Sequence, residues 1–271
     1  MSLFNKKNSE SDAIVQAISR SQAVIEFTVD GIILTANDLF LNALKYQLAE
    51  VQGKHHRIFV EQEDAQSAEY KEFWASLKKG EYQSAEYKRL AKDGSEIWIQ
   101  ASYNPIFDKT GKPYKIVKFA TDITAQKILN SDYASQIAAI SKSQAVIQFN
   151  MDGTIITANQ NFLNALGYSL EEVVGKHHQI FVDPDYAQSA EYQEFWQQLG
   201  EGKYQSAEYK RRTKTGRDIW IQASYNPILD PSGRLQKVVK FASDVTDIVN
   251  ERMRLSELQQ TIDLELVEIA N

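Results

Sequence analysis

The stretch IWIQASYNPI occupies residues 97–106 and recurs unchanged at residues 219–228. A shift of 122 residues places residues 18–124 over residues 140–246 without a gap, and about two-thirds of the aligned positions are identical. Solenoid repeats are far shorter, at roughly 20–50 residues, whereas this period is the size of a small domain. The sequence therefore predicts two tandem copies of one fold.

Within this stretch, the residues alternate between two faces, as they do in a half-buried strand. One face carries Ile97, Ile99, Ala101 and Tyr103, and the other carries Trp98, Gln100, Ser102 and Asn104. We expect the first face to be turned toward helices and any internal pocket. On the preceding strand, the same parity places Tyr87 and Arg89 on one face with Ala85.

Helix signals lie between two groups of strands. Asn37 is suited to begin a short helix after a hairpin that turns at Asp30-Gly31. A second helix is indicated by aromatic and aliphatic residues at i, i+3, i+4 and i+7, namely Tyr70, Phe73, Trp74 and Leu77. Gly80 follows it as a natural stop.

Three further strands are expected at about 81–91, 95–107 and 114–121. The resulting order, β-β-α-α-α-β-β-β, predicts an α+β fold. We expect each copy to form a five-stranded antiparallel sheet with short helices on one face. The predicted segments are a tail and helix at 1–17, a domain at 18–124, a helical linker at 125–139, a second domain at 140–246 and a helix at 247–271.

Composition narrows the class of protein. The net charge of −6 and the pI of about 5.4 disfavour nucleic acid and anionic membranes as partners. No apolar run reaches the roughly 18–20 residues of a membrane-spanning helix, and no signal peptide is recognisable at the N-terminus. The chain has no cysteine, which excludes disulfides, thiolate metal sites and covalently attached c-type haem. We expect a cytoplasmic protein.

Four groups of residues, in their order along the chain, resemble PAS sensor domains. They are DGIILTAN at 30–37, FWASLKKGEY at 73–82, the stretch from Lys92 to Gly111 and VKFATDIT at 117–124. The chain is most similar to the PAS domains of bacterial chemotaxis transducers of the aerotaxis and biofilm-dispersion types. The resemblance covers nearly the whole chain, in both copies.

The resemblance implies a sensory module. Such a module perceives a small ligand, a redox change or an oxygen-related cue, and relays it through helices to a chemotaxis-type output domain. We expect that output domain to be absent from this chain. The alternative function is a ligand-free PAS scaffold for dimerisation. No motif of an enzyme nucleophile, a phosphate-binding loop or a catalytic metal is found, so an enzyme is not expected.

The end of each copy matches the closing Asp-x-Thr of the family, at Asp122 and Thr124 and at Asp244 and Thr246. In the family, this corner couples the sheet to the helix that follows. The alternative is a plain helix cap, because Asp and Thr are both suited to that position.

The helices beyond the domains suggest dimerisation. Leu255, Ile262 and Ile269 are seven residues apart, with Leu258 and Leu266 beside them. This short heptad pattern favours a homodimer through the N- and C-terminal helices. The alternative is an amphipathic helix that packs on its own domain.

The resemblance suggests two candidate cofactors, and b-type haem is the first. Haem needs an axial imidazole and an apolar slot. The histidines that could supply it are His55, His56, His177 and His178. The alternative is that these histidines lie at the surface or at the start of a helix.

Flavin is the second cofactor. Trp74 and Trp196 fall where flavin-binding aerotaxis sensors carry a tryptophan. The alternative is that they are core residues, because an aromatic stripe on a helix is usually packing. The relatives' polar flavin anchors are replaced by Arg89, Ile99 and Ala120 in the first copy and by Arg211, Ile221 and Ala242 in the second.

The arginines leave a third interpretation open. If Arg89 and Arg211 point inward, each needs a partner, because an unpaired buried charge is costly. An anionic small ligand, an internal carboxylate or solvent at the sheet edge could each serve. A domain without any ligand is the remaining alternative.

Overall fold

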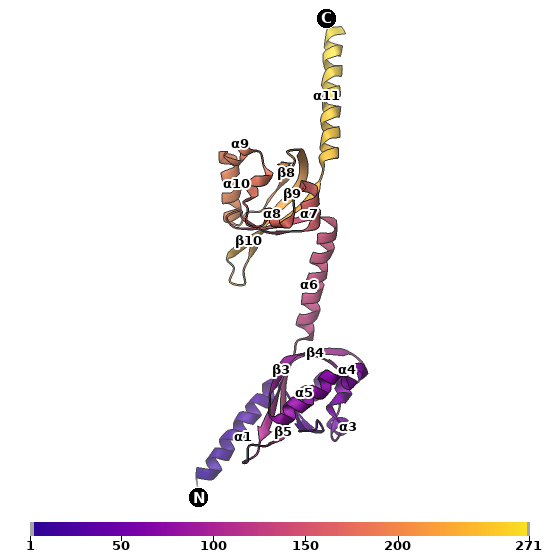
Figure 1. Ribbon diagram of the computed structural model, residues 1–271, viewed down its shortest axis with the longest axis vertical. Helices are drawn as coiled ribbons and strands as arrows, with labels where there is room; N and C mark the ends of the chain where they lie inside the picture. Colours follow the sequence, from indigo (N-terminus) through magenta and orange to yellow (C-terminus); the bar gives the residue numbers. More distant parts are fainter. Residues whose placement is uncertain (1–2, 270–271) are drawn as a thin grey trace. The chain divides into compact units, whose positions relative to one another are not determined.

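The computed structural model describes residues 3–269. The chain divides into two compact units, Met1–Tyr133 and Ala134–Asn271, and each contains a five-stranded antiparallel sheet (Figure 1). The strand order is β2-β1-β5-β4-β3 in the first unit and β7-β6-β10-β9-β8 in the second. The predicted α+β fold in two tandem copies is confirmed.

The first unit contains the elements α1 (Leu3–Ser21), β1 (Ala23–Thr28), β2 (Ile33–Ala36), α2 (Asp38–Leu44), α3 (Leu48–Val51), η1 (His56–Phe59), α4 (Gln62–Gln66), α5 (Ala68–Lys79), β3 (Gln83–Leu90), β4 (Glu96–Phe107) and β5 (Pro113–Asp122). The helix α6 (Thr124–Ser143) follows β5. The short helices η1 and α4 are additional to the predicted order.

The second unit repeats this order. Its elements are β6 (Ala145–Asn150), β7 (Ile155–Ala158), α7 (Gln160–Leu166), α8 (Leu170–Val173), η2 (His178–Phe181), α9 (Pro184–Ala187), α10 (Ala190–Gly200), β8 (Gln205–Arg212), β9 (Asp218–Leu229), β10 (Leu235–Asp244) and α11 (Thr246–Ile269).

The helix ends follow local sequence chemistry. Asn37 caps α2 by accepting a hydrogen bond from Phe40 N at 3.0 Å, and Gly80 ends α5 in the left-handed conformation. Lys45 ends α2 with a positive φ of 60°, a conformation that costs a non-glycine residue energy. No helix within residues 3–269 is long and apolar enough to cross a bilayer.

The core of each domain lies between the sheet and its short helices. Ile99, Ala101 and Tyr103 are buried on the inward face of β4, as the alternation predicted. The outer face of the sheet also carries apolar residues, and Val117 and Phe119 line a groove there with Val15 and Ile18 of α1. Helical residues therefore lie beside both faces of the first sheet.

Candidate functional site

Each domain holds a chain of hydrogen-bonded polar side chains inside its apolar core. In the first domain, the ring of fully buried His56 places Nδ1 2.8 Å from Tyr70 Oη and Nε2 3.0 Å from Tyr103 Oη. Arg89, on β3, donates from Nη2 to the same Tyr103 oxygen at 3.1 Å. These four residues are called the core network below.

The second domain has the same core network, formed by Tyr192, His178, Tyr225 and Arg211. His178 Nδ1 lies 2.9 Å from Tyr192 Oη, and His178 Nε2 lies 3.0 Å from Tyr225 Oη. Arg211 Nη2 donates to Tyr225 Oη at 3.0 Å. The duplication has therefore kept this network as well as the fold.

The direction of these hydrogen bonds follows from charge. Burial, reinforced by the nearby Arg89 and Lys118 cations, lowers the pKa of His56 well below its ordinary value, so the imidazole is neutral. A neutral imidazole donates from one nitrogen and accepts at the other. Because Tyr103 Oη already accepts from Arg89, we assign its own proton to His56 Nε2. His56 Nδ1 then donates to Tyr70.

A second basic side chain lies beside the network. Lys118, on β5, is fully buried, and its Nζ has no hydrogen-bond partner. The Nζ lies 4.8 Å from the ring centroid of Tyr103 and 5.5 Å from that of Phe40. Lys240 is equally buried in the second domain, at 4.7 Å from the Tyr225 ring. Burial lowers the pKa of both lysines well below the usual value.

The sequence analysis did not select these lysines, although a signal was present. In the order Ile116-Val117-Lys118-Phe119-Ala120, period-two alternation places Lys118 with Ile116 and Ala120. All three are buried in the structure. Val117 and Phe119 are also apolar, so parity alone did not decide which face of the strand is inward.

Among the described side chains, the buried residues of the Lys, Arg, Asp and Glu types are all basic, namely Arg89, Lys118, Arg211 and Lys240. Arg89 is only 7% exposed; it donates to Lys88 O at 2.7 Å and lies over the Tyr87 ring at 4.8 Å. Among the described side chains, no carboxylate is buried. The inward-pointing arginine is thus partnered by a hydroxyl, a carbonyl and a ring, and its Nε has no partner.

The start of α6 is joined to the backbone of β4. Trp98 N donates to Thr124 Oγ1 at 2.9 Å, and Ile123 N donates to Trp98 O at 2.8 Å. Asp122 Oδ1 accepts from Thr124 N at 2.8 Å. The residue pair therefore does more than cap a helix, because the threonine side chain also satisfies the neighbouring strand.

The second domain repeats this corner at the start of α11. Trp220 N donates to Thr246 Oγ1 at 3.0 Å, and Val245 N donates to Trp220 O at 2.9 Å. Asp244 Oδ1 accepts from Thr246 N at 2.9 Å and from the Thr246 hydroxyl at 2.5 Å.

Asn37 and Asn159 have a larger role than the helix cap expected from sequence. Asn37 Oδ1 accepts from Val24 N at 2.9 Å as well as from α2, and Nδ2 donates to Ser19 O at 3.0 Å. Asn159 Nδ2 likewise donates to Ser141 O at 3.0 Å, near the end of α6. Each asparagine ties the helix that precedes its domain to the first strand.

Comparison with known proteins identifies the fold family. The family model described as PAS fold matches residues 33–120 and 155–242. The chain belongs to the PAS family. Biofilm dispersion protein BdlA of Pseudomonas aeruginosa is 41% identical over 231 residues, which cover 85% of this chain and 55% of BdlA. The chain thus spans about half the length of that relative.

Two other relatives of the PAS domains are a receptor and an oxygen sensor by name. The aerotaxis receptor of Escherichia coli is 33% identical over 93 residues, which cover 34% of this chain and 18% of the receptor. The oxygen sensor protein DosP of E. coli is 28% identical over 167 residues, 60% of this chain and 20% of DosP. A solved light-oxygen-voltage domain aligns with a TM-score of 0.38 at 21% identity, covering 48% of this chain and 97% of that one. The resemblance to tandem PAS sensors of the chemotaxis and biofilm-dispersion type is confirmed.

The PAS-domain histidines are all engaged in other contacts. Both ring nitrogens of His56 face tyrosine hydroxyls. His55 Nδ1 accepts from Arg57 N at 3.1 Å, and its ring lies against Gly31, where an added Cβ would be 2.8 Å from Nε2. His177 and His178 are held in the same way. An axial ligand needs a free imidazole nitrogen, so His56 and His178 do not fit haem iron in this arrangement.

The tryptophans are surrounded by other rings. Trp74 makes edge-to-face contacts with Phe27, His56 and Phe73, at centroid distances of 5.6, 5.5 and 5.7 Å. Trp196 contacts His178 in the same manner at 5.5 Å. A flavin stacked on either indole would have to displace one of these rings.

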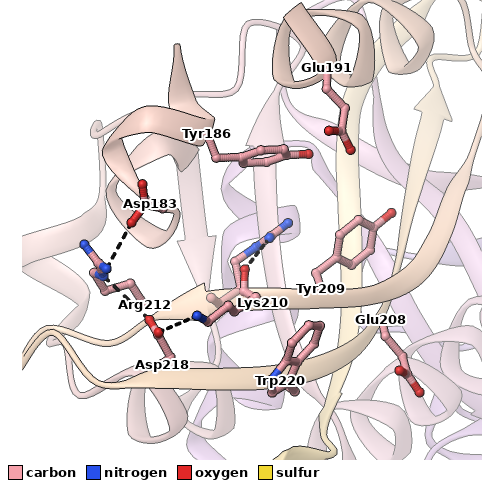
Figure 2. A pocket seen from close by; sticks show the side chains of 10 residues that line it. Asp183, Tyr186, Glu191, Glu208, Tyr209, Lys210, Arg212, Asp218 and Trp220 are labelled. Carbon is pink, nitrogen blue, oxygen red and sulfur yellow. Dashed lines mark hydrogen bonds and ion pairs between the residues drawn. The ribbon is translucent and has the colours of Figure 1, made fainter. Parts of the chain in front are cut away.

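The second PAS domain also has a surface cavity of about 340 Å³ beside Arg211. Figure 2 shows the Tyr186 ring over this cavity and Arg212 between Asp183 and Asp218. Arg212 Nη2 lies 3.0 Å from Asp183 Oδ2, and Arg212 Nε lies 3.7 Å from Asp218 Oδ1.

The lining of this cavity differs between the two copies, because a cavity of the first domain includes Glu61 and Leu90 at the positions of Asp183 and Arg212. Tyr186 and Arg212 correspond to Asp64 and Leu90 of the first domain. The surroundings of the two equivalent arginines are therefore not the same. Within the described residues, no cluster of three or more histidine, aspartate or glutamate side chains could hold a metal ion.

Proposed function

We propose that the chain is a sensory signal-transduction module in which the core of each PAS domain controls the helix that follows it. The supporting observation is that β4 carries both Tyr103 of the core network and Trp98, which with Asp122 of β5 and Thr124 forms the attachment of α6, called the helix anchor below. Tyr103 lies opposite Lys118 in the strand register, and Ile99 lies opposite Asp122. The two rungs are four residues apart, about 13 Å along the strands.

In this proposal, a change in the core network moves β4 and β5, and Thr124 passes the movement to α6 through Trp98. Thr246 does the same for α11. Asp122 and Asp244 hold the threonines in place. A cue acts only through a difference in affinity for two states of the sheet.

The proposed cue is a small ligand, a redox change or an oxygen-related signal, and the proposed target is a chemotaxis-type output domain. The kinship with an aerotaxis receptor and a biofilm dispersion protein supports this. We place the module in the cytoplasm and expect signalling rather than catalysis. Haem and flavin stay proposals that require a rearranged core. An absorption spectrum of protein from cells supplied with haem precursor tests both.

The relay is tested by hydrogen exchange. Replacing Tyr103 and Tyr225 by Phe removes the hydroxyls at the centre of both core networks. The proposal expects faster amide exchange in the first turns of α6 and α11. The control variant replaces Tyr82 and Tyr204, which are 72% and 71% exposed, by Phe. Faster exchange confined to the core, with unchanged helix starts, would refute the relay.

A homodimer through the terminal helices completes the proposal. Leu255, Leu258 and Ile262 are all at least half exposed on α11. Leu266 and Ile269 lie outside the residues whose side chains are described. Replacing Leu255 and Ile262 by Asp should give monomers in light scattering, because charges in the seam oppose pairing. A persisting dimer would place the interface elsewhere.

A ligand-free scaffold is the second candidate function. The close packing of aromatic rings around Trp74 and Trp196 favours it. The scaffold and the sensor differ in one measurable respect, because only the sensor has a ligand that changes helix exchange.

A further inference from the structure

The cationic residues in each PAS core converge on one tyrosine. Arg89 Nη2 lies 3.1 Å from Tyr103 Oη, and Lys118 Nζ lies 4.8 Å from the centroid of the same ring. The second domain has the same arrangement around Tyr225, with distances of 3.0 and 4.7 Å. Two basic groups thus approach a single buried position from β3 and β5, the two strands that flank β4.

This position lacks a negative partner in the protein. No carboxylate among the described side chains is buried, and the nitrogens without a hydrogen-bond partner include Lys118 Nζ, Arg89 Nε and their counterparts Lys240 Nζ and Arg211 Nε. Burying a cation without a partner costs several kcal/mol. A purely structural core would use an apolar residue here, because the lysine makes no compensating hydrogen bond.

The first domain has a cavity of about 200 Å³ whose lining includes residues next to Lys118. It lies between α2 and the sheet and is lined by Phe40, Leu44, Ile99 and Ala120 among others. Phe40 is the second ring beneath Lys118 Nζ, and Ala120 is two residues from Lys118 on the inward face of β5. Because an apolar cavity of about 150 Å³ holds a benzene molecule, this volume suits a compact organic molecule.

We propose that each PAS domain binds a small organic carboxylate, held by Lys118 and Arg89 in the first domain and by Lys240 and Arg211 in the second. The inference rests on the proposed sensory function and names its ligand class. The carboxylate group meets the two cations at Tyr103, and the apolar body of the ligand lies toward Phe40 and Ala120. Inorganic anions fit less well, because they lack an apolar body.

The proposed ligand would also lie close to the helix anchor, the residues that attach α6 to the sheet. Asp122, which holds Thr124 at the start of α6, lines the same cavity. Burial and the nearby Arg89 lower the pKa of the Lys118 amine well below its ordinary value, so its charged form is disfavoured when no anion lies beside it. A bound carboxylate stabilises the ammonium form and gives β5 an ion pair.

The test is a titration of the full chain with acetate, propionate, benzoate and succinate, followed by thermal unfolding and by calorimetry. Benzamide and succinamide serve as neutral counterparts, with ionic strength matched by chloride. We expect a saturable rise in Tm with at least one carboxylate and none with either amide. The carboxylate affinity measured by calorimetry should fall at least tenfold in Lys118→Met/Lys240→Met.

The matched control is Lys115→Met/Lys237→Met on the same strands, whose lysines contact Glu26 and Gln148 on the outer face. This control should bind like the wild type. In the absence of ligand, Lys118→Met/Lys240→Met should be at least as stable as the wild type. No saturable response to any of the four carboxylates, or an equal response in the lysine variant, would overturn the proposal.

The proposed relay to the helices and the proposed carboxylate site can be refuted independently of each other. A carboxylate that binds through Lys118 but leaves exchange at residues 124–127 unchanged would support the ligand site and refute the relay. Altered helix exchange in Tyr103→Phe/Tyr225→Phe without any carboxylate binding would support the relay and refute the ligand class.

Discussion

Tyr103 is the junction of its core network, and its hydroxyl can be removed without changing the shape of the ring. Tyr103→Phe leaves two buried groups without partners, Arg89 Nη2 and His56 Nε2. An unsatisfied buried group costs about 1–3 kcal/mol, so the free energy of unfolding should fall by about 2–6 kcal/mol per domain. Tyr225→Phe should have the same effect in the second domain, where both bonds recur.

The assay is urea unfolding of Tyr103→Phe/Tyr225→Phe, monitored by tryptophan fluorescence. The matched control is Tyr82→Phe/Tyr204→Phe, in which exposed hydroxyls are lost and the expected change is within about 0.5 kcal/mol. The variant midpoint should fall at an unchanged slope. A change as small as that of the control would refute the reasoning, because it would mean that the core hydroxyls satisfy no buried partner.

Three further predictions concern the backbone and pH. Lys45→Gly should raise stability by about 1 kcal/mol, since it relieves a left-handed residue and gives up only exposed contacts with Asp93 and Ser95; a lower urea midpoint would contradict this. Gly153→Ala should destabilise more than Gly175→Ala, because both glycines have positive φ but only at Gly153 would the new Cβ meet a side chain, at 2.4 Å from an imidazole nitrogen; equal urea midpoints would exclude the clash. Stability should fall as pH drops below about 6.5, by up to about 1.4 kcal/mol per pH unit for each of His56 and His178. These histidines have lowered pKa values when folded, so the unfolded chain binds protons first, and His56→Gln/His178→Gln should flatten that slope in pH-dependent urea unfolding.

Local rules predicted much of the fold from sequence. The caps at Asn37 and Gly80 and the inward face of β4 depend only on neighbouring residues, and the structure confirms them. The same strand pattern occurs in both copies of the repeat, which supports the prediction of each strand. Short helices such as η1 and α4 were missed, because four or five residues carry too little periodicity to be distinguished from a loop.

The site was less predictable, because its partners are distant in sequence. His56 lies at the start of η1, one of the expected alternatives, but it is buried rather than at the surface, and its hydrogen bonds reach residues 14 and 47 positions away. His56 and Arg89 meet through Tyr103, and Trp74 packs on the His56 ring. Lys118 was missed because both faces of β5 are apolar, and a lone lysine on such a strand is usually exposed. Only the register of β4 with β5 places it at the network.

The pairing of the first strand with the last has a consequence for folding in a duplicated chain. Strand β1 pairs with β5, and Glu26 contacts Lys115 across them, but Lys237 occupies the same position on β10. Each β1-like strand thus has two nearly equivalent partners, and exchange between similar neighbours is a common misfolding route of tandem repeats. On the ribosome, β5 emerges before β10 has been made, so vectorial synthesis gives β1 its correct partner first. Refolding from denaturant loses that order and should yield strand-exchanged species that synthesis avoids.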